Sequence, residues 1–119
     1  MAQNMIEEIA KEVGFIIEEV SYIEWNLLAE LDLDTLEDLT LGEIIRIVKK
    51  EDIFDDWTTG ELEDILRKRN DLVHKYFKRK DFEKQNKNAT FLKNELNYLT
   101  KLRKQIAQFN RWLIDSNKE

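Results

Sequence analysis

Cysteine and proline are absent from this chain of 119 residues, which also contains only three glycines and one histidine. Without cysteine, disulfides, thiolate nucleophiles and zinc-thiolate sites are excluded, and one histidine cannot build a histidine-rich metal site. We therefore expect no metal and no cofactor. Proline and glycine are the strongest helix breakers, so their scarcity in a chain that is 37% charged favours helices.

Long apolar runs are missing as well. The longest runs span only a few residues, and residues 1–8 lack the basic start and apolar block of a secretion signal. These absences lead us to expect a cytoplasmic protein that does not bind a membrane. The length fits one domain, residues 1–119, which is large enough to bury a core without covalent cross-links.

The apolar residues recur at three- and four-residue steps. This spacing predicts amphipathic helices over about residues 4–31 and from Leu92 to near the end of the chain. Residues 40–43 and 58–61 each fit a capping box, which predicts a second helix from Thr40 and a third over about residues 59–79. Residues 32–39 suit a loop or a short helical turn, and residues 84–88 suit the last turn.

The expected fold class is therefore all-α. We expect an antiparallel helical bundle of four main helices, to which residues 32–39 could add a fifth short one. The tryptophans Trp25, Trp57 and Trp112 are expected to anchor the core or an interface.

Charge is divided unevenly along the chain. Residues 1–66 hold four Lys or Arg and nineteen Asp or Glu, whereas residues 67–119 hold fifteen and six. The net charge is therefore −15 in the first part and +9 in the second, which sum to the −6 of the whole chain. Such asymmetry favours a positive surface that attracts RNA, or an attraction between the two halves inside the bundle or across a dimer.

The change of sign coincides with residues 67–79, which include the only histidine, His74. An imidazole exchanges protons near neutral pH, and a guanidinium can hold a phosphate through two hydrogen bonds. This combination indicates a protein that binds a phosphodiester and acts on it chemically. Basic residues around the histidine are candidates for binding the substrate: Arg67, Lys75, Lys78 and Arg79.

Residues 69–74, Arg-Asn-Asp-Leu-Val-His, resemble the Arg, polar residue, then histidine pattern of the HEPN superfamily. Continuing to Tyr76, they resemble the Arg-x4-His-x-Tyr form of HepT-type toxins. The resemblance rests on about ten residues and on the expected helical fold. It implies a metal-independent endoribonuclease of toxin-antitoxin or defence type, acting as a homodimer that joins two motifs in one cleft.

By this resemblance, His74 would be the acid or base in attack by the ribose 2′-hydroxyl, and Arg69 would stabilise the phosphoryl charge. Asn70 would orient the substrate or the imidazole. Tyr76 would be the target of adenylylation by a nucleotidyltransferase antitoxin.

Helical geometry separates the two main candidates. At 100° per residue, Arg69 and His74 lie about 140° apart around a straight helix. Arg69 falls in an apolar stripe, where it needs a carboxylate, a helix end or a dimer cleft as its partner. Arg67 and Asn70 fall on the side of His74, and Arg67 also fits a longer Arg-x6-His spacing, so either arginine could be the functional one.

Two other readings remain open. The same basic surface would suit a non-catalytic HEPN-like module that binds nucleotide, RNA or a protein partner. The motif could also be a coincidence in a plain helical interaction protein, in which His74 is an ordinary surface residue and Arg69 forms a structural salt bridge.

Overall fold

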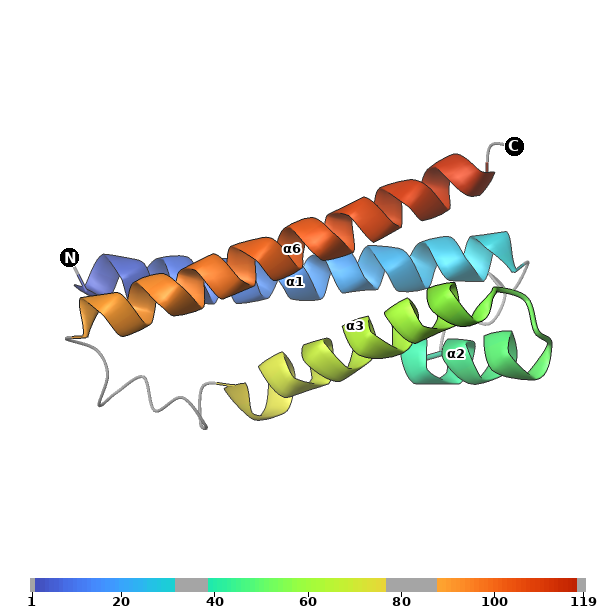
Figure 1. The fold of residues 1–119 in the computed structure, drawn as a ribbon, viewed down its shortest axis with the longest axis horizontal. Coiled ribbons are helices and arrows are strands. Elements are labelled where there is room, and N and C mark those ends of the chain that lie inside the picture. The colour runs from blue at the N-terminus through green and yellow to red at the C-terminus, as the bar shows by residue number, and fades with distance from the viewer. Residues whose placement is uncertain (1, 32–38, 77–87, 118–119) are drawn as a thin grey trace.

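The computed structural model describes residues 2–31, 39–76 and 88–117. These residues form α1 (Ala2–Glu30), α2 (Leu41–Lys50), α3 (Asp56–His74) and α6 (Ala89–Asn117), with no strand among them (Figure 1). The all-α architecture with four main helices is confirmed. Residues 32–38 of the expected loop at 32–39, and most of the expected turn at 84–88, lie outside the described residues.

The two long helices, α1 and α6, lie side by side and run in the same direction (Figure 1). The register of their contacts agrees: Arg103 donates to Glu12 at 2.9 Å, and Asn26 donates to Asn110 at 2.6 Å. α3 runs in the opposite direction and packs on α1 and α2. The antiparallel relation therefore holds for α3, whereas α1 and α6 are parallel.

The core is built from the apolar stripes that the spacing predicts. On α1 these residues include Ile9, Ile16 and Leu27, and on α6 they include Leu92, Leu99 and Ile106, all fully buried. Burying such stripes against each other is the main source of stability for helices of this kind.

The second helix begins as predicted. Thr40 is the N-cap of α2, its hydroxyl accepts a hydrogen bond from the Glu43 backbone N–H, and the Glu43 carboxylate accepts one from the Thr40 N–H. Both members of the capping box are therefore present.

The predicted capping box at residues 58–61 is wrong. α3 begins earlier, at Asp56, because the carboxylate of Asp55 is the N-cap and accepts a hydrogen bond from the Thr58 N–H at 2.7 Å. Thr58 and Thr59 lie inside the helix and are buried. A carboxylate is an equally good cap and also interacts favourably with the helix dipole, so Asp55 takes the position.

α3 ends at His74, where the Lys75 N–H donates to the Asp71 carbonyl at 2.8 Å. The expected helix over 59–79 is thus described only to this point, since residues 77–79 lie outside the described part of the chain. Within that part, no helix is long and apolar enough to cross a membrane.

Candidate functional site

The exposed side of α3 carries three of the predicted site residues. Arg67, Asn70 and His74 follow one another at steps of three and four residues, and all three are exposed. Leu62, Ile65 and Leu72 on the opposite side are buried. The predicted division of this helix into a packed side and a side open to solvent is confirmed. Val73 is an exception among the apolar residues of α3, because it is 45% exposed.

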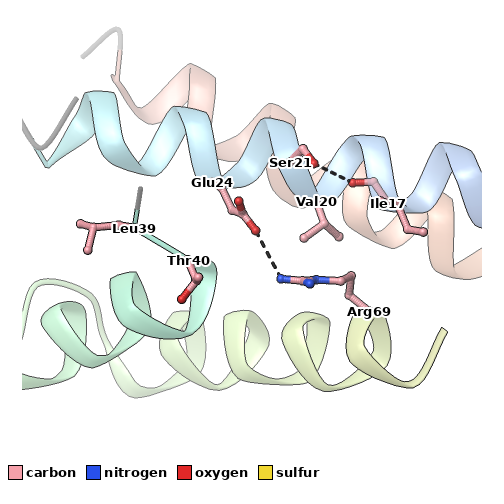
Figure 2. A pocket seen from close by; sticks show the side chains of 7 residues that line it. All are labelled: Ile17, Val20, Ser21, Glu24, Leu39, Thr40 and Arg69. Atoms are coloured by element: carbon pink, nitrogen blue, oxygen red, sulfur yellow. Dashed lines mark hydrogen bonds and ion pairs between the residues drawn. The ribbon is translucent and has the colours of Figure 1, made fainter. Parts of the chain in front are cut away.

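Arg69 faces α1, where it pairs with a carboxylate. Its guanidinium lies 3.4 Å from the Glu24 carboxylate, and the two side chains are 24% and 28% exposed (Figure 2). Burial raises the pKa of Glu24 above its ordinary value, and the charge of Arg69 opposes that rise. A carboxylate partner for Arg69 was one of the expected solutions, and it is the one found.

Arg69 and Glu24 also line a pocket of about 410 Å³ between α1, α3 and the start of α2 (Figure 2). Its volume lies within the usual range for small-ligand pockets. The Ser21 hydroxyl at its wall donates to the Ile17 carbonyl at 3.1 Å. The remaining lining residues are Val20, Leu39 and Thr40. The pocket thus joins a charged pair to a wall of both apolar side chains and hydroxyl groups.

Two basic residues of the motif are partly neutralised by one acid. Arg67 and Lys68 both form ion pairs with Asp64, the latter at 2.9 Å. The hydrogen bond from Lys68 is the main cause of a lowered pKa at Asp64, and the charges of both cations add to it. The Arg67 side chain is nevertheless 76% exposed, so it remains accessible to a ligand.

The other candidates divide into accessible, buried and undescribed residues. Lys75 is exposed next to His74. Tyr76 is only 1% exposed, so transfer of a group to its hydroxyl would require the residues over it to move first. Lys78 and Arg79 lie outside the described residues.

A single chain therefore brings His74, Asn70 and Arg67 to one side of α3 and leaves Arg69 on another. The catalytic, binding and modification roles of these residues stay predictions. Sequence reasoning did not single out Glu24, although a carboxylate was one of the three partners that the position of Arg69 in an apolar stripe left open. Choosing one of the 25 Asp and Glu residues of the chain requires the register of α1 against α3, which a single sequence does not provide.

Among the residues that the structure describes, no three His, Cys, Asp or Glu side chains gather as a metal-binding group. Comparisons with protein-family models, with curated proteins and with solved structures found no match to this chain.

Proposed function

We propose that this protein is a cytoplasmic endoribonuclease of toxin or defence type that cleaves RNA without a metal ion. The observation that supports the proposal best is the exposed imidazole of His74 at the last residue of α3, with exposed Asn70 one turn before it and exposed Lys75 after it. Such a histidine is accessible to a phosphodiester, and the lysine supplies positive charge beside it.

The proposed chemistry uses the ribose itself as the nucleophile. His74 takes the proton of the 2′-hydroxyl, the 2′-oxygen attacks the adjacent phosphorus, and the 5′-oxygen leaves and receives a proton. The products are a 2′,3′-cyclic phosphate and a 5′-hydroxyl. Asn70 lies on the same side as His74, one turn away, and would orient the substrate or the imidazole.

The arginine that stabilises the phosphoryl charge has to come from another position. Because Arg69 faces α1 and pairs with Glu24, one chain does not offer Arg69 and His74 to the same phosphate. We propose that a second copy completes the site, with Arg69 of one subunit and His74 of the other in one cleft. Arg67, which is exposed on the side of His74, is the alternative arginine.

The test is cleavage of a defined RNA in the presence of EDTA. We expect cleavage that leaves a 2′,3′-cyclic phosphate, and we expect His74→Ala and Arg69→Ala each to reduce the rate by about a hundredfold or more. A substrate with a 2′-deoxy nucleotide at the cleaved position should resist cleavage, because it lacks the nucleophile.

Arg111→Ala is the matched control, since Arg111 is exposed on α6 far along the chain from the motif. It should retain wild-type activity, and circular dichroism should show that all three variants are folded. Cleavage that persists in His74→Ala at the wild-type rate would contradict the proposal. An unchanged rate in Arg69→Ala together with a loss in Arg67→Ala would assign the phosphate contact to Arg67.

A second candidate is a non-catalytic module that binds a nucleotide or RNA. The pocket lined by Arg69 and Glu24 favours it, because a guanidinium and a carboxylate side by side offer both donors and acceptors to a ligand. Binding of RNA or nucleotide that is weakened in Arg69→Ala, with no cleavage in any buffer, would select this candidate.

A further inference from the structure

The pocket between α1, α3 and the start of α2 presents two charged groups of opposite sign to a ligand. Glu24 comes from α1 and Arg69 from α3, and their side chains point toward each other (Figure 2). Both are partly buried, with exposed fractions of 28% and 24%. Charged groups in such a setting are screened less by water and salt than groups on an open surface, so their hydrogen bonds to a ligand contribute more to affinity.

The ion pair leaves most of the hydrogen-bonding capacity of both groups unused. A guanidinium has five N–H donors. In the part of the chain that the structure describes, Arg69 uses one of them, in a bond of 3.4 Å to one Glu24 oxygen. That distance is longer than the usual range for such bonds. The pair can therefore accept a ligand without first breaking a strong contact.

A carboxylate beside a guanidinium is complementary to guanine among the four RNA bases. A carboxylate accepts two parallel hydrogen bonds, and a guanidinium donates two. Guanine carries two adjacent donors, N1–H and the 2-amino group, and two adjacent acceptors, O6 and N7. None of the other three bases has both pairs. Because N1–H lies next to O6 on the ring, the two partners have to lie side by side, as Glu24 and Arg69 do.

The size and the walls of the pocket also suit a base. Its volume of about 410 Å³ is within the range of small-ligand pockets, and the apolar side chains of Ile17, Val20 and Leu39 offer contacts to a flat ring. The hydroxyls of Ser21 and Thr40 at the wall already donate hydrogen bonds within the protein. The charged pair is therefore the part of the pocket best able to distinguish one base from another.

We propose that this pocket binds a guanine base, with the Glu24 carboxylate accepting from N1–H and the 2-amino group and the Arg69 guanidinium donating to O6 and N7. The base belongs either to a free guanine nucleotide or to a guanosine of an RNA. This proposal rests on the second candidate function, which is the binding of a nucleotide or RNA. It engages Arg69 with a base, so that in a ribonuclease the phosphate contact would fall to Arg67.

The test titrates the protein with guanosine 5′-monophosphate and with matched analogues, followed by NMR of the backbone amides. Inosine 5′-monophosphate lacks the 2-amino donor, and the 7-deaza analogue of the guanine nucleotide lacks the N7 acceptor. We expect each analogue to bind about tenfold more weakly than guanosine 5′-monophosphate, because each loses one hydrogen bond to a charged group. The largest amide shifts should lie at pocket residues such as Ser21 and Thr40.

Two variants assign the contacts of the base to individual side chains. Glu24→Gln should lose the preference for guanine over inosine, because an amide offers one acceptor oxygen where a carboxylate offers two. Arg69→Lys should lose the preference for guanine over its 7-deaza analogue, because an ammonium does not donate two parallel hydrogen bonds. A variant that merely unfolded would lose affinity for every analogue by the same factor, so these preferences report on the contacts themselves.

Glu12→Gln is the matched control. Glu12 is also a carboxylate of α1 paired with an arginine, at 2.9 Å from Arg103, but it lies outside the pocket. This variant should keep both preferences of the wild type.

An oligonucleotide separates the two sources of the base. The probe is a short 2′-O-methyl oligouridine with a single guanosine, which lacks the hydroxyl needed for cleavage, and its partner has inosine in place of that guanosine. If it binds more tightly than guanosine 5′-monophosphate and loses affinity with inosine, an RNA is the ligand. If the free nucleotide binds more tightly, a guanine nucleotide is the ligand.

Equal binding of the guanine and inosine nucleotides would overturn the proposal, and so would the absence of pocket shifts with millimolar guanosine 5′-monophosphate. Metal-independent RNA cleavage that is lost in His74→Ala would still stand in that case, because His74 does not line this pocket. Conversely, guanine binding with the expected preferences and no RNA cleavage would support this proposal and contradict that of a ribonuclease.

Discussion

Glu24 is the ion-pair partner of Arg69, the arginine of the predicted motif. Its carboxylate neutralises a guanidinium that would otherwise be half-buried without a partner, and the pair lies at the wall of a pocket. The pKa of Glu24 is nevertheless raised, because burial raises it more than the charge of Arg69 lowers it. An ion pair of this kind contributes modest stability and fixes the direction in which the arginine points.

Arg69→Met should raise the pKa of Glu24 further, because the substitution removes the charge that opposes the effect of burial. The folded state then holds the Glu24 proton to a higher pH than the unfolded state does, so stability falls as pH rises through the folded pKa. This fall, present above the ordinary value of 4.5, should be larger in Arg69→Met than in the wild type. Carbon NMR titration of the Glu24 carboxyl and thermal melts between pH 4 and pH 7 measure the two effects.

Lys68→Met is the control for this prediction, because Lys68 pairs with Asp64 and has no contact with Glu24 in the structure. Its Glu24 titration should match that of the wild type. If Arg69→Met leaves the Glu24 pKa where it was, the 3.4 Å pair does not act on that carboxyl.

At the scale of the element, the beginning of α3 shows where sequence reasoning works and where it fails. Thr40 and Thr58 both open a Thr-x-x-Glu pattern, yet only Thr40 forms a capping box. Near Thr58 a carboxylate three residues earlier caps the helix first. The existence of both helices followed from apolar spacing, whereas the starting residue depended on a competition between two good caps that local sequence does not decide.

Asp55→Ala should lower the melting temperature by several degrees, because it leaves the Thr58 N–H without its acceptor. Asp55→Asn should recover much of the loss, since its side-chain carbonyl can still accept that hydrogen bond. The hydrogen bond from Thr58 lowers the pKa of Asp55, so its contribution is present above the ordinary value of 3.8 and is lost as pH falls through the folded pKa.

Asp56→Ala separates the cap from general loss of negative charge, because Asp56 is an exposed acid in the first turn of the same helix. Thermal melts of these variants at pH 3 and pH 7 are the measurement. A melting temperature in Asp55→Ala no lower than that of Asp56→Ala would show that the cap hydrogen bond adds nothing measurable.

At the scale of the whole molecule, helix number and type could be predicted from the sequence, but helix direction could not. Periodicity is a property of each segment, whereas the parallel arrangement of α1 and α6 depends on the segments that connect the helices. The candidate site likewise has one feature that the sequence predicted and one that it did not. The exposed position of His74 followed from the helical repeat, while the pairing of Arg69 with Glu24 depended on packing between helices far apart in sequence.

The division of charge between the halves of the chain contributes to this packing. Glu12 and Glu24 belong to the acidic half, and they pair with Arg103 and Arg69 of the basic half. Arg103 also stacks over the Phe15 ring, with its guanidinium carbon 4.4 Å from the ring centroid. These contacts support an attraction between the two parts of the chain inside the bundle. That attraction was one of the explanations that the sequence left open.

A double-mutant cycle of Glu12→Gln and Arg103→Gln should measure how strongly charge joins α1 to α6. We expect a coupling free energy of about 0.5–1 kcal/mol at low salt, because Arg103 is 41% exposed and its pair is only partly shielded from water. The coupling should shrink in high salt, where such pairs are screened. Arg103→Lys should lose part of it, since an ammonium lacks the flat surface that stacks on Phe15. A coupling near zero at low salt would mean that these charges do not stabilise the bundle, and the basic half would then be explained better by an anionic ligand such as RNA.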